Sequence, residues 1–314
     1  MENLEKQLQT LNEQVKLSNH LNYQILMSNI ISNLKFNNEK DKEILLLLLQ
    51  DRDRNYVRIN NNKQCYKNII KYLKLLRPIE LPISDLIRVG GVGDGGYVMY
   101  NGGGERYLNN FDGVALSLGV SEYSPWDLEM AEKGIKVIEY DGSIEKCPYK
   151  HKNIIFNKKF IGNANDKNTI TLEQVIKDNN LTKNNNILQC DIENCEWDML
   201  ENIDFEILNK YFSQIIFEFH GCNPEEEQGV SLRTKILEKL NNYFIPVHLH
   251  FNNHGKIFYS NSLFLSTTLE VTYIRKDILK IDGLVYKDTI ELFDYDCPIW
   301  PSNPEIPVRF SFKE

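Results

Sequence analysis

Val114-Ala-Leu-Ser-Leu-Gly-Val120 and Lys136-Val-Ile-Glu-Tyr-Asp141 are the two stretches that decide the predicted fold. Each is a short apolar run with the length of a buried β-strand, and each leads into a turn that contains glycine. Residues 125–133, which lie between them, have a helical pattern with proline in the first turn, where proline is tolerated. Two such strands joined by a helix predict parallel neighbours in an α/β sheet.

The same alternation continues along the chain. Five further strands are predicted at 153–160, 186–191, 214–220, 246–251 and 269–274, with helices at 171–179, 195–208 and 232–243. Short apolar strands alternating with helices indicate a mostly parallel sheet covered on both faces. The last connection is too irregular for a crossover helix, so we expect an antiparallel last strand. The predicted fold is α/β and Rossmann-like, with seven strands and an added N-terminal helical segment.

The sequence divides into three predicted segments. These are an N-terminal helical segment at 1–80, the α/β domain at 81–277 and a C-terminal extension at 278–314. Prolines at 298, 301, 304 and 307 exclude a regular helix around Trp300. The extension is therefore expected to wrap the domain or to close over a bound acceptor.

The N-terminal segment carries an apolar seam with heptad spacing. The seam consists of Leu4, Leu8, Leu11 and Val15. It loses its register at Ser18 and Asn22. Two interpretations stay open at this point. The segment is either a short coiled coil that pairs two copies of the chain, or an amphipathic helix laid on the main domain.

Composition and charge narrow the class of protein. Of 314 residues, 42% are hydrophobic and 25% are charged, the balance of a globular protein. The net charge of −8 is a poor match to the phosphates of nucleic acid, so no nucleic-acid partner is expected. The polar N-terminus lacks the apolar region of a secretory signal, and the longest apolar run, 44–49, is too short to span a membrane.

The six cysteines form no Cys-x-x-Cys pair, which argues against a zinc site. Three of them lie in or beside predicted buried strands. We interpret them as reduced thiols, which is typical of a cytoplasmic protein.

The ends of the first two predicted strands carry residues suited to a nucleoside. Gly119 lets the backbone approach a ligand, and Asp141 can accept hydrogen bonds from ribose hydroxyls. A dinucleotide site needs Gly-x-Gly-x-x-Gly directly after the first strand. Here that position reads Leu118-Gly-Val-Ser-Glu-Tyr123, and the glycine-rich stretch 90–96 precedes the strand. The pattern favours an adenosine-containing ligand other than NAD.

Later strands deliver acids and histidines to the same predicted edge of the sheet. The fourth strand leads to Asp191 and Glu193, and the fifth leads to His220. On the sixth, His248 and His250 are two residues apart and so are predicted on one face. Histidine is suited to take a proton from an alcohol near neutral pH.

The residues Asp191-Ile-Glu-Asn-Cys-Glu-Trp197 resemble the Asp-x-Glu-Gly-x-Glu-Trp motif of the FkbM-type methyltransferases. Further similar stretches lie at 88–98, 124–127, 248–253 and 269–273, so that the resemblance covers about 85–277. One departure is Asn194 in place of the motif's glycine, and Asn also tolerates a left-handed turn.

The resemblance implies a class I methyltransferase fold with S-adenosylmethionine as the methyl donor. By similarity, Gly119, with Val120 and Ser121 beside it, and Asp141 would hold the donor. Asn163 would lie near the adenine. Asp191 would line the junction of donor and acceptor, and Asp94 and Tyr97 would lie near the methionine end or the acceptor. The implied acceptor is a hydroxyl of a sugar, in a surface polysaccharide or its nucleotide-activated precursor.

The hypothesis for the chemistry is direct transfer of the methyl group to a hydroxyl. The candidate bases are His220, His250 and Asp191. Alternatively, Asp191 and Glu193 hold a divalent cation such as Mg²⁺, which lowers the pKa of the acceptor hydroxyl. Equally, the acids could serve only as hydrogen-bond acceptors for the donor and the backbone.

Two other classes of function remain open. A sugar-nucleotide glycosyltransferase often carries Asp-x-Asp at a strand end, but here this spacing occurs only at 51–53 and 294–296, outside the strand–helix region. A non-catalytic scaffold with a degenerate methyltransferase domain is the third class. The presence of both Gly119 and Asp141 argues against it.

Overall fold

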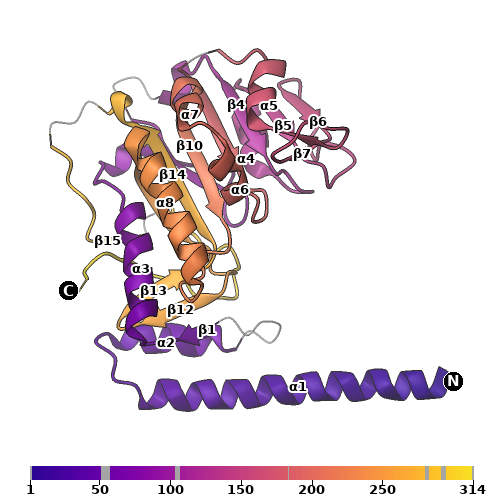
Figure 1. Cartoon of the computed structure of the whole chain (residues 1–314), viewed down its shortest axis with the longest axis vertical. Coiled ribbons are helices and arrows are strands. Elements are labelled where there is room, and N and C mark those ends of the chain that lie inside the picture. The colour runs from indigo at the N-terminus through magenta and orange to yellow at the C-terminus, as the bar shows by residue number, and fades with distance from the viewer. Residues whose placement is uncertain are drawn as a thin grey trace.

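The centre of the molecule is a seven-stranded sheet. The computed structural model describes residues 2–50, 57–102, 107–182, 184–279, 283–290 and 295–312. The strands of the sheet lie in the order β11 (Phe244–Phe251), β14 (Leu269–Arg275), β10 (Phe212–Phe219), β9 (Asn186–Cys190), β4 (Val114–Leu118), β5 (Lys136–Tyr140) and β6 (Ile154–Asn157). All seven are the strands that the sequence predicts, and the mixed α/β architecture is confirmed (Figure 1).

Strand β14 is the one antiparallel strand of the seven-stranded sheet. Strands β10, β9, β4, β5 and β6 pair in parallel. Strand β14 pairs antiparallel with both β10 and β11 and lies between them. The last of the seven sheet strands in chain order is therefore antiparallel, as predicted from the irregular connection that precedes it.

The two faces of the sheet have different covers. Helices α3 (Lys63–Leu76), α5 (Leu172–Asp178), α6 (Glu196–Asn202), α7 (Phe205–Tyr211) and α8 (Glu227–Tyr243) form one core with the sheet, with α6, α7 and α8 in front of it in Figure 1. The other face packs against α4 (Pro125–Glu132) and the hairpin of β2 (Leu86–Val89) and β3 (Tyr97–Tyr100). The sheet is thus buried on both faces, which explains the continuous apolar runs in its strands.

One predicted helix is in fact two. The sequence predicts a single helix over 195–208, but α6 ends at Asn202 and α7 begins at Phe205. Asp204 separates them, because its side chain accepts a hydrogen bond from the backbone N–H of Glu206 at 3.0 Å and caps α7. An N-cap residue has non-helical backbone angles, so it ends the preceding helix and starts a new one.

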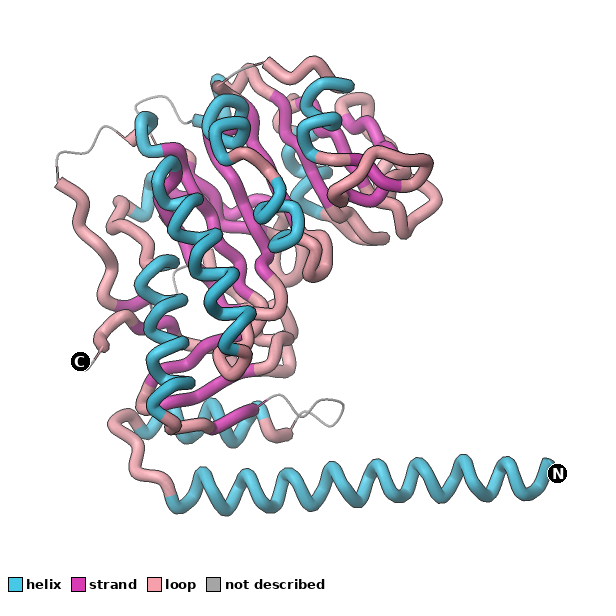
Figure 2. Tube along the Cα trace, in the orientation of Figure 1, coloured by secondary structure: helices cyan, strands magenta, loops and turns pink. Residues whose placement is uncertain are grey.

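The N-terminal segment begins with a long projecting helix. Helix α1 (Glu2–Asn33) extends away from the rest of the chain, and α2 (Glu39–Leu48) lies against the body (Figures 1 and 2). Strand β1 (Val57–Ile59) pairs with β12 (Ile257–Ser260), which pairs with β13 (Leu263–Ser266) in a second sheet. Residues 57–80, including α3, are therefore packed into the main body. The sequence did not predict this small sheet.

The C-terminal extension wraps the domain as an irregular strap. In its described part no α-helix follows β14, as the prolines predict. The remaining short elements of the chain are β7 (Phe160–Ile161), β8 (Thr169–Ile170), β15 (Thr289–Ile290), β16 (Val308–Arg309) and the 3₁₀ turns Ile83–Asp85, Tyr107–Asn110 and Lys276–Ile278. None of the helices in the described ranges is long and apolar enough to cross a membrane.

Candidate active site at the carboxyl edge of the sheet

Gly119 lies directly against the backbone of Asp191. Its φ is +81°, and a Cβ at this position would come within 1.6 Å of the Asp191 carbonyl oxygen. The Gly119 N–H donates to the Tyr140 carbonyl at 2.9 Å, and the Asp191 N–H donates to the Leu118 carbonyl at 2.8 Å. The ends of β4, β5 and β9 are therefore tied together, and only glycine fits at the point of contact.

Asp141 holds the turn that follows β4. Its Oδ2 accepts the backbone N–H groups of Val120 and Ser121, each at 2.9 Å. Its Oδ1 accepts the N–H and the hydroxyl of Ser143, each at 2.6 Å. Burial alone would raise the pKa of Asp141, but the bonds from Ser143, Ser121 and Val120 outweigh it and lower that pKa. The carboxylate is thus ionised, with about four acceptor positions already engaged.

This arrangement has a consequence for a ribose at Asp141. A ribose hydroxyl can reach this carboxylate only in exchange for one of the four existing bonds. The Ser143 hydroxyl is the easiest to release, because a side-chain rotation frees it while the backbone turn stays intact.

Asn163, predicted near an adenine, lies exposed on the loop after β7. The neighbouring Phe160 ring packs against Gly142, where a Cβ would meet it at 2.3 Å. The loop thus adjoins the Asp141 turn, but Asn163 itself makes no contact that defines a base site.

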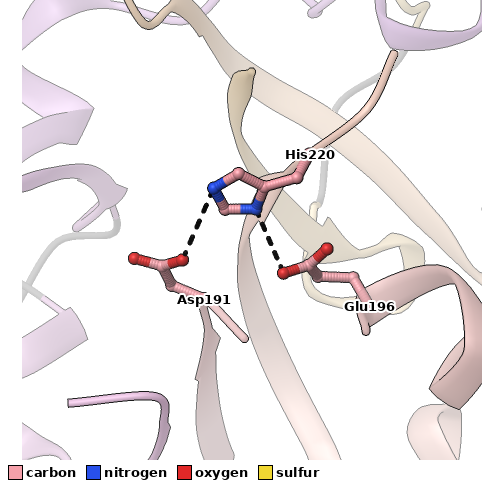
Figure 3. A group of neighbouring side chains, drawn as sticks. All are labelled: Asp191, Glu196 and His220. Atoms are coloured by element: carbon pink, nitrogen blue, oxygen red, sulfur yellow. Dashed lines mark hydrogen bonds and ion pairs between the residues drawn. The ribbon is translucent and has the colours of Figure 1, made fainter. Parts of the chain in front are cut away.

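His220 lies at the centre of an acidic cluster at the ends of β9 and β10. We use "acidic cluster" for Asp191, Glu193, Glu196 and Glu218 around this imidazole. Its Nδ1 lies 3.2 Å from Glu196, and its Nε2 lies 3.6, 3.7 and 3.9 Å from Glu193, Glu218 and Asp191. Figure 3 shows the ring between Asp191 and Glu196.

Glu196, like Glu218, was not among the predicted site residues. It is fully buried at the first turn of α6, and its Oε1 accepts both the Ile192 N–H and the His220 ring. The chain reaches this position through a left-handed turn at Glu193 and Asn194, with φ values of 52° and 78°. The expected left-handed conformation of Asn194 is confirmed. This turn brings Glu196 back to the carboxyl edge of the sheet, beside His220. The spacing of residues in the sequence does not show this.

The cluster continues across the next strands. Glu218 accepts a hydrogen bond from Asn252 at 2.9 Å, and it lies in register with Glu270 of β14. Tyr97 is buried beneath the cluster, where its hydroxyl receives a 3.3 Å hydrogen bond from Gln189. Burial raises the pKa of Tyr97, and the charges of Asp191, Glu218, Glu270 and Asp94 raise it further. Asp94 and Tyr97 therefore both lie close to the cluster, although Asp94 is exposed and Tyr97 is not.

The groups of the acidic cluster bind their protons more tightly than the same groups do in an unfolded chain. Burial lowers the pKa of His220, but the hydrogen bond and charge of Glu196 and the charges of Glu218 and Glu193 outweigh it and raise that pKa to about 9. Burial, then neighbouring carboxylates, raises the pKa of Glu218 to about 8 and that of Asp191 well above its usual range. At neutral pH the imidazole is thus charged and Glu218 is protonated, while Asp191 holds a proton more tightly than an ordinary carboxyl group.

The donor atoms fit a divalent cation. One ligand atom from each of Asp191, Glu196 and His220 lies within 4.8 Å of the other two. Oxygens of Asp191, Glu196 and Glu218 are buried without a hydrogen-bond partner. Such buried, unpaired acceptors are costly unless a cation or a proton compensates them. The ligand set differs from the predicted pair of Asp191 and Glu193, because the Glu193 side chain is 83% exposed at the rim.

His250 and His248 lie on one face of β11, as predicted, but they are enclosed. His250 is held on both nitrogens, by Glu270 and by Glu305, each at 3.0 Å. His248 lies 2.9 Å from Asp296. Because both His250 nitrogens are engaged, the structure argues against His250 as a base. Asp296 and Glu305 come from the C-terminal strap, more than 40 positions later in the chain.

The titration of the cluster predicts the pH dependence of stability. Without metal, the melting temperature should fall as pH rises from about 6.5 to about 9, the interval between the unfolded and folded pKa values of His220. The folded protein binds more protons than the unfolded chain over this range, so the stabilising contribution is complete below 6.5 and lost through 9. For His220 alone this is about 3 kcal/mol, or on the order of 5 °C.

Thermal unfolding between pH 5.5 and 9.5 in a chelator tests this, and Mg²⁺ or Mn²⁺ should restore stability most at the alkaline end. A melting temperature that rises from pH 6.5 to 9 in the chelator would contradict the charge state assigned to the cluster.

Comparison with known proteins adds no assignment to this geometry. No protein-family model matches the chain, and no match was found among curated proteins.

Proposed function

We propose that the protein is an S-adenosylmethionine-dependent O-methyltransferase that acts on a hydroxyl of a sugar or glycan. The observation that carries this proposal is the junction of Gly119, Asp141 and Asp191 at the ends of β4, β5 and β9. It combines a close backbone approach at glycine with an ionised carboxylate on the next strand. This is the pattern expected around a nucleoside without a diphosphate.

The topology of the sheet supports the same proposal. The expected methyltransferase-like fold has seven mostly parallel strands with an antiparallel last one, and β14 is that antiparallel strand. Ligands of such sheets bind at the carboxyl ends of the strands. The acidic cluster lies at this edge, next to the Gly119 junction through Asp191.

The acidic cluster is suited to a cationic donor and to removal of a proton. In the proposed reaction the acceptor oxygen attacks the methyl carbon, the carbon–sulfur bond breaks, and the hydroxyl proton passes to the protein. His220 is the proposed base, with Asp191 as the alternative. His220 is protonated in the free protein, so the positive sulfonium must first displace its proton by lowering its pKa.

A divalent cation would act on the same groups. Asp191, Glu196 and His220 would hold it, and when bound it would lower the pKa of a coordinated hydroxyl. In that case His220 serves as a ligand. The charge of the cation would lower the pKa of Glu218, which would then take the proton as a carboxylate. The pH dependence of stability with and without Mg²⁺ separates these two arrangements.

Trp300 supports a sugar as the acceptor. Its indole is 46% exposed and stacks on His254, with ring centroids 5.0 Å apart. The side-chain oxygen of Asn253 fixes the strap here, because it accepts the backbone N–H of Trp300 at 2.8 Å. The adjacent Asn252 binds Glu218 of the acidic cluster. A rigid aromatic ring, fixed by the residue next to the one that binds Glu218, offers a platform for the apolar face of a sugar. The six free cysteines fit the further proposal of a cytoplasmic protein.

Calorimetric titration with S-adenosylmethionine and S-adenosylhomocysteine tests the proposal. We expect micromolar binding that Asp141→Ala weakens by about a hundredfold, because the turn at Val120 and Ser121 loses its anchor. Asp204→Ala is the matched control, since Asp204 also accepts a backbone N–H, that of Glu206 at 3.0 Å, but lies at the start of α7 with Asn184 and Arg275, at the opposite edge of the sheet.

If neither ligand binds the wild-type protein, the methyltransferase proposal is wrong. Binding of a nucleoside diphosphate with Mn²⁺ in the same instrument would then favour the glycosyltransferase alternative. Equal losses of affinity in Asp141→Ala and Asp204→Ala would show a general effect on folding and remove the evidence for the site.

A further inference from the structure

Helix α1 exposes an unusual amount of apolar surface. Over residues 5–19 every side chain is exposed. The exposed large apolar residues of the helix are Leu8, Leu11, Val15, Leu17, Leu21, Ile25, Leu26 and Ile30, each at least 38% exposed. A helix of this kind gains little stability in isolation and normally depends on packing of its apolar face. The surface therefore indicates a protein partner.

Helix α1 is anchored to the body of the protein near its C-terminal end and on one side. Met27 and Ile31 are buried, the Tyr23 hydroxyl donates to the Val57 carbonyl, and Gln24 donates to the Leu49 carbonyl at 2.5 Å. At 3.6 residues per turn, positions 27 and 31 lie roughly opposite positions 8, 11 and 15. The apolar seam thus faces away from the body, and the rest of the helix projects beyond it (Figures 1 and 2).

The exposed face has heptad spacing over most of its length. Leu8, Val15 and Asn22 occupy a positions, and Leu11, Ser18 and Ile25 occupy d positions. Ser18 and Asn22 interrupt the seam without displacing it, because Ile25 returns to the d position. An asparagine at an a position prefers to face its own equivalent, which favours two strands in register.

The flanking positions also suit a second copy of the same helix. Gln7, Asn12, Gln14 and Asn19, at g and e positions, carry no charge, so two copies would not repel each other there. In a parallel pair, a g residue meets the e residue five positions later on the other strand. This places Leu21 against Leu26 of the second copy, beside the polar Asn22 layer. The charged residues Lys6, Glu13 and Lys16 lie at b and f positions, and Glu5, at an e position, has no g residue five positions earlier to face.

We propose that two copies of the chain pair through α1 as a parallel, in-register, two-stranded coiled coil. The pairing buries the seam of Leu8, Leu11, Val15 and Ile25 and places the two bodies at the same end, on the outer sides of the coiled coil. The inference is independent of the chemistry proposed for the active site.

Light scattering of the full chain during size exclusion is the first test. The expected mass is twice the 36.7 kDa of one chain. Leu11→Glu with Val15→Glu places four carboxylates in the seam of the dimer and should give monomers. Gln9→Glu with Thr10→Glu adds the same charge outside the seam and should leave the dimer intact. A monomeric wild-type protein, or a dimer that the seam variant leaves intact, overturns the proposal.

Cross-linking tests the orientation. Leu11→Cys places two thiols across one d layer of a parallel, in-register pair, within disulfide reach, and oxidation should link the chains. Gln9→Cys, on the outer surface, should link no more than the wild-type protein, whose exposed Cys195 sets the background. Equal cross-linking by the two variants overturns the parallel register.

Discussion

Replacing Gly119 with alanine is expected to abolish donor binding and to destabilise the protein by about 4 kcal/mol or more. The new Cβ would lie 1.6 Å from the Asp191 carbonyl oxygen. Both atoms are attached rigidly to backbone, so no side-chain rotation relieves the overlap. The ends of β4 and β9 must separate, which breaks the Gly119–Tyr140 and Asp191–Leu118 hydrogen bonds. Denaturant unfolding and calorimetry with S-adenosylhomocysteine measure the two effects.

Gly134→Ala is the matched control. Gly134 also has a positive φ, +89°, but open space surrounds the position of its Cβ. Gly134→Ala should lose only about 1–2 kcal/mol of stability, the conformational cost of alanine in the left-handed region. It should bind the donor as tightly as the wild-type protein. If both variants lose the same stability and both bind the ligand, the contact between Gly119 and Asp191 has no role in the site.

Replacing His220 with alanine is expected to lower turnover by about 10²–10⁴-fold, the usual contribution of a general base. The affinity for S-adenosylmethionine should change much less, because no donor contact in the proposal uses this ring. Since the pKa of His220 is about 9 in the free protein, the wild-type kcat/KM should rise with pH up to about 9. The variant should lose this rise. A panel of free and nucleotide-linked sugars supplies the acceptors for the assay.

His151→Ala controls for loss of an imidazole outside the site and should retain activity. Full turnover by the His220 variant would rule out this residue as base or metal ligand. The pH profile separates a chemical role from a structural one, since a variant that merely folds less well loses amplitude and keeps the shape of the profile.

The strands were predictable because their signal is local. The runs at 114–120, 136–141 and 186–191 are rich in apolar residues, since a sheet covered on both faces buries nearly all side chains of β4, β5 and β9. The antiparallel β14 was predictable from the irregular connection before it. The sequence pattern over 195–208 is helical throughout, so it did not predict the break between α6 and α7. The break comes from the N-cap at Asp204.

The sequence by itself determined the sheet, the glycine at the end of β4 and the acids that follow β5 and β9. Each of these depends on residues that are neighbours in the chain. Tertiary structure alone decided how the site is charged. His220 became an imidazolium because Glu196 and Glu218 reach it from a helix start and a strand. His250 became enclosed because Glu305 arrives on the strap, 55 positions away. Electrostatic energy depends on distance and burial in space, which residue spacing does not encode.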